Sequence, residues 1–469
     1  MAMAASVVSP SIGSSKVSVR EIFVVRPSQP LNRSTIFLSN IDRTHGYFSR
    51  NLFFFRDNPG TQAVVEHLHK ALSKLLVAYP GHAGRLVVNP VTNRLEIDCN
   101  SAGSLLAFAT SHLSIHDASV DDFDDLFLSP AEARSLEDLP LLTVQVTHLG
   151  GDNGFAIAIL NHHLLDDATS GIFFLLNLAS ISRGDCLYLA PNFDRTQLRA
   201  RDPPKVDFEH REFTNVGGSR FAITPDSILA AEKSQREAPR KTRKTYHFSF
   251  HRLNELKKVV THDGLVSRCS SFEALAALVW RAHARALESS SSAETLLKLH
   301  FVMDTRNILQ PPLGSNFSGN GQFGVVAEMT WEDMCKLPLS HIVLCIQEAR
   351  KMLTDEYMRS AIDYLELHPD HWHVAGNSQT KINTWPRLMS KAVELDLGWG
   401  KPARVEFPLD NRNSAITFFP FDANGNVDGF YVSVKLDPAP VAAFEEHIAA
   451  LEKECENVIS PLSTHPHNQ

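Results

Sequence analysis

The sequence contains no uninterrupted run of about 20 apolar residues, which is the length that a membrane-spanning helix requires. Cysteine is scarce as well. The six cysteines form no C-x-x-C pair, which fits a reducing compartment better than a disulfide framework. Positive charge is in deficit: the net charge of -8 argues against a nucleic-acid-binding protein, because such proteins present a basic face. We therefore expect a cytoplasmic protein with no transmembrane segment and no nucleic-acid partner.

Three short motifs that would indicate other chemistry are absent or out of context. G-x-S-x-G does not occur, which removes the commonest route to a serine hydrolase. GNGQFG at 319–324 has dinucleotide-binding spacing, but it lacks the preceding strand and following helix that the motif needs. HPDHWH at 368–373 offers three histidines without a supporting thiol or carboxylate pattern, so a polar loop is favoured over a metal site. We expect no bound cofactor and no metal ion.

The hydrophobic periodicity predicts a protein of mixed helices and strands. Apolar residues recur at helical spacing over 61–80. The alternation at 142–149, the turn GGDNG and the apolar run at 155–160 predict a β-hairpin. Ser270 and Glu273 have the spacing of a capping box at the start of a second helix. A last hairpin and an amphipathic helix are predicted near the C-terminus, and the fold class is α+β or mixed α/β.

The length of 469 residues predicts two domains. A polar, basic segment with little hydrophobic periodicity lies between two halves that both show strands and helices. We therefore place an N-terminal domain at 1–195, a crossover linker at 196–245 and a C-terminal domain at 246–469.

The stretch NHHLLDDATSG at 161–171 directly follows the apolar run FAIAIL and carries the most reactive side chains. We expect His163 where the chain leaves the strand, with Asp167 four residues later. A histidine there is suited to general-base catalysis, because its unperturbed pKa of about 6.5 lies near the operating pH. From these residues alone, two alternatives stay open: a hydrogen-bonded histidine pair at a strand end, or a metal site of His162, His163 and Asp167.

Together with DLGWGKP at 396–402, this stretch resembles the two signatures of the plant BAHD acyltransferases, H-x-x-x-D and D-F-G-W-G. Similar segments cover most of the chain: FLSNID, LLVAYPGHAGRL, DRTQLRARDPP, SSFEALAALVWRA, MDTRNILQPPL with FSGN, and SAIDYLELHPD. Both His162–Asp166 and His163–Asp167 fit the first signature. We choose His163, because the family's aspartate is followed by a small or apolar residue, then any residue, and often serine.

The resemblance implies a two-domain fold like that of chloramphenicol acetyltransferase, with a tunnel between the domains that reaches His163 from both faces. It implies an O- or N-acyltransferase that uses acyl-CoA as a co-substrate, with His163 taking a proton from the acceptor. Asp167 is implied to be structural and to pair with Arg306. The indole of Trp385 is implied to donate to the reacting carbonyl oxygen. The second signature is implied to shape the fold through Asp396, Gly398, Trp399 and Gly400.

Candidate binding residues follow from the same resemblance. Asn383 and Thr384 are implied to line the acceptor side. The candidates for contact with CoA are Ser270, Ser271, Lys241 and Arg243. For the two basic residues, a solvated crossover is the alternative.

Two positions depart from the family pattern. Ala168 stands in place of the usual glycine after the motif aspartate, and Leu397 replaces the aromatic residue of the second signature. Leucine keeps the apolar bulk at the second position. Neither departure touches the proposed base.

The substrate class is indicated by SAIDYLELHPD and DRTQLRARDPP, which look most like the hydroxycinnamoyl-transferring branch. This favours an aromatic donor such as coumaroyl- or caffeoyl-CoA. Ala375 stands where shikimate and quinate enzymes carry an arginine, so a carboxylate-bearing acceptor is disfavoured, while alcohols, phenols and amines stay open. The alternative is a non-catalytic relative that binds acyl-CoA or a partner. We expect a monomer of specialised metabolism.

Overall fold

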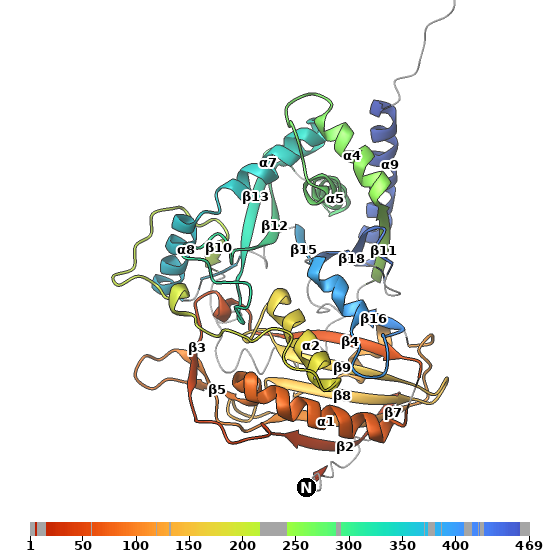
Figure 1. Cartoon of the computed structure of the whole chain (residues 1–469). Coiled ribbons are helices and arrows are strands. Elements are labelled where there is room, and N and C mark those ends of the chain that lie inside the picture. Colours follow the sequence, from red (N-terminus) through yellow and green to blue (C-terminus); the bar gives the residue numbers. More distant parts are fainter. Residues whose placement is uncertain are drawn as a thin grey trace, which may run out of the picture.

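Two units make up the protein, each built on a mixed β-sheet with helices against it (Figure 1). The computed structural model describes residues 5–6, 16–57, 59–118, 120–130, 133–215, 242–287, 292–369, 371–373, 380–385, 387–407, 415–420, 422 and 426–459. The first unit is the lower one in Figure 1, and the second lies above it.

The first unit contains a seven-stranded sheet and a small three-stranded sheet. Their strands are β1 (Ala5–Ser6), β2 (Val17–Val25), β3 (Thr35–Phe37), β4 (Phe48–Phe55), β5 (Arg85–Val88), β6 (Leu95–Asp98), β7 (Ser104–Ser111), β8 (Leu142–Leu149), β9 (Gly154–His162) and β16 (Arg404–Glu406). The large sheet has the order β1-β2-β7-β8-β9-β4-β16, and the small one has the order β3-β6-β5. In the large sheet, β7 and β8 run parallel and the other neighbours run antiparallel.

Helices α1 (Thr61–Ala78) and α2 (Ala168–Ser182) pack against each other and lie along this sheet (Figure 1). The apolar face predicted for the first helix is buried, and the helix ends just before Pro80, because a residue that precedes proline avoids helical geometry. Side chains of a strand alternate between faces, so β4 places Phe53 and Phe55 in the core beneath the helices and Phe54 in a core on the opposite face. The neighbouring strand β9, which lies between β8 and β4, is buried along its whole length.

The second unit contains a six-stranded sheet in the order β11-β18-β17-β15-β12-β13 and a pair β10-β14. Their strands are β10 (Phe213–Asn215), β11 (Thr242–Ser249), β12 (Leu296–Asp304), β13 (Gln322–Thr330), β14 (His371–His373), β15 (Thr380–Thr384), β17 (Ala415–Phe419) and β18 (Gly429–Leu436). The helices are α4 (Phe250–Thr261), α5 (Ser271–Leu287), α6 (Trp331–Lys336), α7 (Leu339–Lys351), α8 (Asp355–Leu367) and α9 (Pro438–Ile459). Short 3₁₀ helices are η1 (Asp42–Thr44), η2 (Pro80–Ala83), η3 (Val120–Leu126), η4 (Thr196–Leu198) and η6 (Arg387–Glu394).

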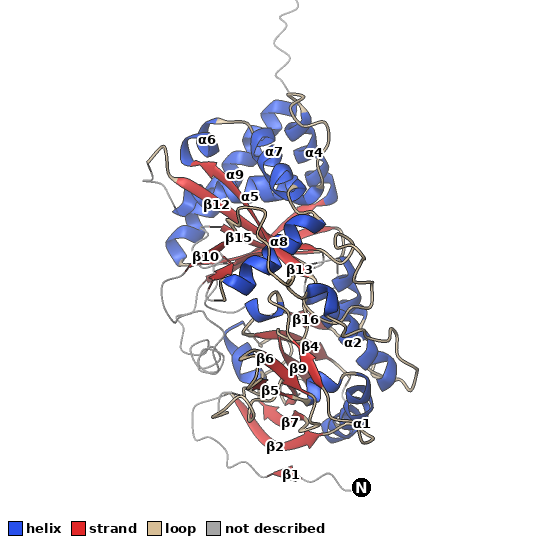
Figure 2. Cartoon of the chain, turned by 90° about the vertical axis from the view of Figure 1, so that its left-hand side faces the viewer, coloured by secondary structure: helices blue, strands red, loops and turns tan. Residues whose placement is uncertain are grey.

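Helices α4, α5, α7 and α9 gather at the far end of the second unit, and α5, α7 and α9 pack on its sheet (Figure 2). The C-terminal helix buries the apolar face that its sequence predicts: Val441, Phe444, Ile448 and Leu451. In the part of the chain that the structure describes, no helix combines the length and the apolar character needed to cross a membrane.

The elements predicted from periodicity are confirmed. The segment 61–80 is helical over α1, and β8 and β9 pair antiparallel as the predicted hairpin. The capping box of α5 is present: the N–H of Ser270 donates to Glu273 Oε2 at 2.8 Å, and the N–H of Glu273 donates to Ser270 Oγ at 3.2 Å. The last predicted hairpin is formed by β17 and β18.

One segment of the second half of the chain crosses to the first unit. The strand β16 pairs antiparallel with β4 at the edge of the seven-stranded sheet, and η6 packs on α2. Figure 1 shows β16 in blue beside the orange strand β4. The domain limits of 1–195, 196–245 and 246–469 stay predictions, and the structure adds that a strand from the second half of the chain, β16, completes the sheet of the first unit.

Candidate active site

The turn between β9 and α2 carries the first signature. The apolar strand ends at His162, and the N–H of His163 donates to the carbonyl of Tyr47 at 2.8 Å. Asp167 is the N-cap of α2, and its Oδ1 accepts the N–H of Ser170 at 2.9 Å. Aspartate is favoured at this position because its carboxylate satisfies a free N–H of the first helical turn. The side chain of Asp167 is therefore fixed by the helix that it starts.

Asp167 and Arg306 form a buried, two-pronged ion pair, as the resemblance implied. Arg306 donates from Nη1 to Oδ2 at 3.0 Å and from Nη2 to Oδ1 at 2.9 Å. The N–H of Gly321 also donates to Oδ2, at 2.9 Å. Burial alone would raise the pKa of Asp167, but the charge and hydrogen bonds of Arg306 outweigh it and lower that pKa. The carboxylate is saturated with donors, which suits a structural role.

His163 is oriented by the amide of Asn320, which lies just before β13. The histidine Nδ1 is 3.0 Å from Asn320 Oδ1. The amide cannot be turned the other way, because its Nδ2 donates to Asp42 Oδ1 at 2.9 Å and to the carbonyl of His163 at 2.8 Å. Nδ1 must therefore carry the proton, and Nε2 keeps its lone pair. This is the tautomer that a general base needs.

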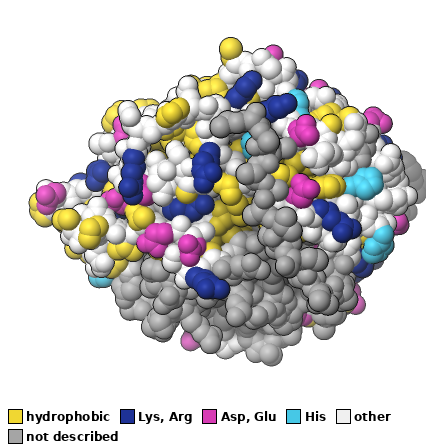
Figure 3. Space-filling model, turned by 90° about the horizontal axis from the view of Figure 1, so that it is seen from below, with side chains coloured by type: hydrophobic (Ala, Val, Ile, Leu, Met, Phe, Trp, Pro, Cys, Tyr) yellow, Lys and Arg dark blue, Asp and Glu magenta, His cyan; other side chains and the backbone are white. Residues whose placement is uncertain are grey.

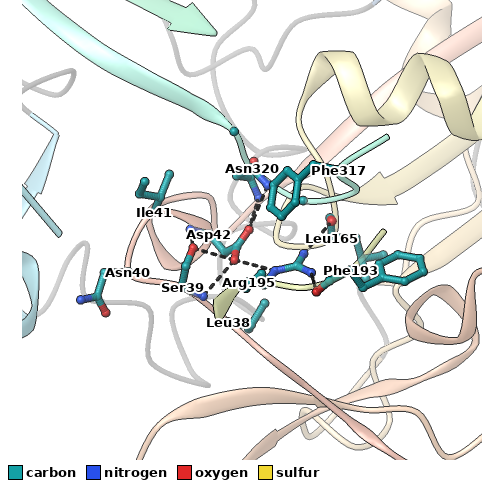
Figure 4. Close-up of polar contacts among 12 residues, drawn as sticks. Leu38, Ser39, Asn40, Ile41, Asp42, Leu165, Phe193, Arg195, Phe317 and Asn320 are labelled. Carbon is teal, nitrogen blue, oxygen red and sulfur yellow. Dashed lines mark hydrogen bonds and ion pairs between the residues drawn. The ribbon is translucent and has the colours of Figure 1, made fainter. Parts of the chain in front are cut away.

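Asp42 holds the amide of Asn320 in place (Figure 4). Its fully buried carboxylate accepts five hydrogen bonds. Two come from the N–H and hydroxyl of Ser39, at 2.9 and 2.7 Å, and one comes from Arg195 Nε, at 2.9 Å. The remaining two come from the backbone N–H and Nδ2 of Asn320, at 3.0 and 2.9 Å. Three distant segments of the chain thus meet behind the histidine.

Two aromatic rings lie against His163. The ring of His45 stacks on it with 4.5 Å between centroids, and the ring of Tyr47 lies 4.8 Å away. His163 is partly exposed to solvent. Burial of the imidazole lowers the pKa of His163, whereas the negative charges of Asp166 and Asp167 raise it by a smaller amount. The imidazole is therefore neutral at neutral pH and able to accept a proton.

His162 is a core residue. Its ring is fully buried with its edge on Phe48, and its Nδ1 accepts the N–H of Leu164 at 3.3 Å. Burial lowers the pKa of His162 to about 3. Because His163 keeps solvent exposure, this arrangement supports the choice of His163 over His162.

The loop with dinucleotide-like spacing at 319–324 has a packing role. A Cβ at Gly319 would lie 2.8 Å from Arg195 Nη2, and a Cβ at Gly321 would lie 2.9 Å from the guanidinium carbon of Arg306. At Gly319 the ring of Phe317 is closer still, at 2.7 Å, so a side chain at either position would collide with a packed ring or guanidinium group. The loop supplies the wall behind His163 and runs into β13.

The second signature lies on the first unit, next to α1 and α2. Asp396 Oδ1 accepts the N–H of Gly398 at 2.8 Å and of Gly400 at 2.9 Å. Both glycines have positive φ, +104° and +84°, which side chains disfavour. Trp399 packs edge-on against Phe55, Phe155 and His67. This geometry supports the implied role in shaping the fold.

Leu397, the departure from the signature, is fully buried in the core of the first unit. Its carbonyl accepts a hydrogen bond from the hydroxyl of Ser182 at 2.6 Å, at the last residue of α2. Ala168, the other departure, is the first residue of α2, directly after the cap.

The residues implied to face the reaction centre and the acceptor lie at the end of β15. The backbone N–H of Trp385 donates to the carbonyl of Phe418 at 3.0 Å, and the centroid of its ring lies 4.1 Å from that of Phe407. Asn383 and Thr384 are partly buried. Thr384 Oγ1 is buried and has no hydrogen-bond partner among the described residues. Their roles stay predictions.

The CoA candidates have different surroundings. Ser270 caps α5, and Ser271 is the first residue of that helix. Arg243 is held by Glu406 at 3.3 Å and donates from Nε to Ser433 at 3.0 Å, and its contact with CoA stays a prediction. Lys241 and Ala375 lie outside the described residues.

Among the described residues, no group of three histidine, cysteine, aspartate or glutamate side chains is placed to hold a metal ion. Seen from below, Lys and Arg side chains alternate with Asp and Glu over the described part of the surface (Figure 3). That surface shows a mixture of charges of both signs.

The residues that orient His163 were missed in the sequence. Asp42 lies in FLSNID, Arg195 in DRTQLRARDPP, and Asn320 directly follows FSG. All three segments matched the family, and that match was the available signal. Their common function became visible only through their hydrogen bonds to one another.

Comparison with known proteins identifies a family and relatives of this chain. A family model described as Transferase family matches residues 15–451. An omega-hydroxypalmitate O-feruloyl transferase of Arabidopsis thaliana is 31% identical over 414 residues, 86% of this chain and 86% of its own. A shikimate O-hydroxycinnamoyltransferase of Nicotiana tabacum is 30% identical over 405 residues, 82% of this chain and 89% of its own.

Among solved structures, vinorine synthase is similar with a TM-score of 0.68 at 17% identity, covering 93% of this chain and 98% of its own. This likeness confirms the predicted two-domain architecture of mixed sheets and helices. The tunnel between the domains stays a prediction. With the family model matching nearly the whole chain, the chain belongs to the BAHD acyltransferases and is an acyl-CoA-dependent acyltransferase.

Proposed function

We propose that the protein transfers a hydroxycinnamoyl or related aromatic acyl group from acyl-CoA to an acceptor hydroxyl or amine, with His163 as the general base. The observation that carries the proposal is the hydrogen bond from His163 Nδ1 to Asn320 Oδ1 at 3.0 Å. This bond leaves Nε2 as an acceptor on a partly exposed ring.

In this mechanism, Nε2 of His163 takes the proton of the acceptor hydroxyl or amine. The oxygen or nitrogen of the acceptor attacks the thioester carbonyl at the same time. The carbonyl becomes a tetrahedral oxyanion, which collapses with release of CoA thiolate. The imidazolium then returns the proton to the thiolate, so that free CoA leaves and the base is restored. The indole of Trp385 is assigned as donor to the oxyanion, an interaction typically worth about 3–4 kcal/mol. No step needs a metal ion or a resident cofactor.

The aromatic donor is supported by two relatives whose names describe feruloyl and hydroxycinnamoyl transfer. One of them is named for omega-hydroxypalmitate, which fits an alcohol acceptor. The absence of the arginine at Ala375 disfavours a carboxylate-bearing acceptor. Asn383 and Thr384 are assigned to the acceptor side, supported by the unpartnered Thr384 hydroxyl among the described residues. We propose that the protein acts as a monomer in the cytoplasm.

Replacement His163→Ala tests the base. We expect kcat with coumaroyl- or caffeoyl-CoA and a phenolic or long-chain alcohol to fall by about 10²- to 10⁴-fold, because a positioned base typically contributes that much. Release of CoA is followed with a thiol reagent, and circular dichroism checks the fold.

The control is His112→Ala, which changes an exposed histidine between β7 and β8 and should leave turnover unchanged. Undiminished transfer by the His163 variant would remove the mechanism. Binding of acyl-CoA by the native protein without any acceptor-dependent release of CoA would identify a non-catalytic relative instead.

A further inference from the structure

A second histidine and aspartate meet directly behind the first signature. His82 lies in η2, between α1 and β5, and is fully buried. Its ring stacks on Phe174 of α2 with 4.6 Å between centroids and an angle of 6° between planes. Its Nε2 lies 3.1 Å from Oδ2 of Asp166, the residue that immediately precedes the motif aspartate. The mechanism above uses neither residue.

The carboxylate of Asp166 is buried between partners that carry no permanent charge. Oδ1 accepts a hydrogen bond from Asn161 Nδ2 at 2.7 Å, and Oδ2 faces His82. The other ring nitrogen of His82, Nδ1, is buried and has no partner among the described residues. Among the described residues, the partners of the Asp166 carboxylate are thus an amide and an imidazole, and neither is a guanidinium or ammonium group.

The charges around His163 do not cancel. Asp42 is paired with Arg195 at 2.9 Å, and Asp167 is paired with Arg306 at 2.9 Å. Among the described residues here, three buried carboxylates face two buried guanidinium groups, and Asp166 is the carboxylate that pairs with neither guanidinium. Buried charges are screened much less than exposed ones, so this excess negative charge acts on the neighbouring imidazole.

The other side chains described in contact with His163 are rings and an amide. His162 and His45 are imidazoles, Tyr47 is a phenol, and Asn320 is a neutral amide. Asp304, which also contacts Arg306, has a side chain that is 45% exposed and is therefore screened by water. Among the described residues, the titratable and charged groups around the base and its partners are Asp42, His45, Tyr47, His162, Asp166, Asp167, Arg195, Asp304 and Arg306.

We propose that the uncompensated negative charge of Asp166, held in place by His82 and Asn161, stabilises the imidazolium that forms when His163 takes the proton of the acceptor. This inference rests on the proposed role of His163 as general base. Asp166 acts through His163, so it is a positioning residue that sets the strength of the base. Asp167, which is paired with Arg306, holds the turn.

The sign of the effect follows from the charges. Burial lowers the pKa of His163, and the negative charges of Asp166 and Asp167 oppose that lowering. Of these two carboxylates, only Asp167 is paired with a buried guanidinium group. The reaction needs the neutral ring, so kcat/KM of the native enzyme falls as the pH is lowered through this pKa. Removing the charge of Asp166 lowers the pKa further and gives a weaker base. The acidic limb then moves to lower pH, while the plateau rate decreases.

The test compares Asp166→Asn with His82→Gln in the full-length protein. Asparagine keeps the size of Asp166 and its acceptor for Asn161 but removes the charge. We expect the acidic limb of kcat/KM to move down by about half a pH unit or more, with a several-fold lower plateau. Glutamine at position 82 disturbs the same buried contact but keeps a donor to Asp166, so its limb should stay at the native pH. Thermal unfolding checks that both variants are folded.

An unchanged limb in Asp166→Asn, or equal shifts in both variants, would overturn the inference. If Asp166→Asn does not fold, two variants that keep the charge decide. For His82→Gln the measurement is the acidic limb of kcat/KM, and for Asp166→Glu it is the pH dependence of the rate at which diethyl pyrocarbonate modifies His163. A native pH dependence in both variants supports the inference, and a shift in both contradicts it. Failure of the proposed function is distinct, because it would show as activity retained by His163→Ala.

Discussion

At the scale of single residues, the tautomer of His163 depends on the side-chain amide of Asn320, whose orientation is fixed by its own hydrogen bonds. Asn320 donates to Asp42 and to the His163 carbonyl, so only its oxygen is free to face the ring. Arg195 in turn fixes Asp42 from the other side. The reactivity of the base therefore depends on residues that do not touch the substrate.

Replacing Asn320 by alanine should expose this dependence. Without the acceptor for the Nδ1 proton, both tautomers of His163 become populated and a buried carboxylate oxygen of Asp42 loses a donor. Loss of a buried hydrogen bond costs about 1–3 kcal/mol, which corresponds to roughly a tenfold to hundredfold fall in kcat, with a smaller change in KM. Steady-state kinetics measure the split.

The matched control is Asn316→Ala, which removes a side-chain amide from the same loop. The amide of Asn316 donates to the carbonyl of Ala190 and not to Asp42 or His163. Its kcat should stay near the native value. Equal losses of kcat in the two variants would mean that the loop as a whole, and not the orientation of His163, is responsible.

At the scale of elements, α5 shows how a local signal fixes a helix. The reciprocal hydrogen bonds of Ser270 and Glu273 satisfy donors at its first turn, and Arg350 of α7 forms an ion pair with the Glu273 carboxylate. Glu273 thereby joins α5 to a neighbouring helix. Ser270 is at once the cap and a candidate for contact with CoA.

Replacement Ser270→Ala separates these two roles. We expect the free energy of unfolding to fall by about 1 kcal/mol, because an N-cap hydroxyl is typically worth that much. Urea denaturation measures the change. In Ser271→Ala, where no capping bond is lost, the free energy should change by less than about 0.5 kcal/mol. Equal losses in both would contradict the capping role, and a raised KM for acyl-CoA in either would indicate contact with CoA.

The sequence predicted the elements well because their signals are local. The stripe of α1, the alternation of β8 and the capping box of α5 each lie within about 20 residues. The ion pair of Asp167 with Arg306 came from the family resemblance, since the two residues are 139 positions apart. The bonds of Asp42 to Arg195 and Asn320 span 153 and 278 positions, and no periodicity carries such information.

At the scale of the whole molecule, the two units are tied at several places. The strand β16 of the second half completes the sheet of the first, and Glu406 at its end pairs with Arg243 of β11. On another side, Asn40 donates to Glu366 of α8, and Arg94 pairs with the same carboxylate. Neither unit is built from one continuous stretch of chain.

We therefore expect the units to unfold together. Variants in which only Trp280 of the second unit or only Trp399 of the first is kept, with the other tryptophans replaced by phenylalanine, should show the same midpoint in urea. The shared strand joins the two cores into one cooperative system. Fluorescence of each variant and far-ultraviolet circular dichroism give the midpoints. Separated midpoints would mean that β16 adds little to the coupling.

The short segment Ser39 to Asp42 has a consequence for how activity arises. Asp42 bonds Arg195 and a residue of the loop before β13, while its neighbour Asn40 reaches α8. A polypeptide still being synthesised could complete much of its first sheet and yet hold an imidazole with no fixed proton. We therefore expect turnover only after the loop before β13 has packed against Asp42.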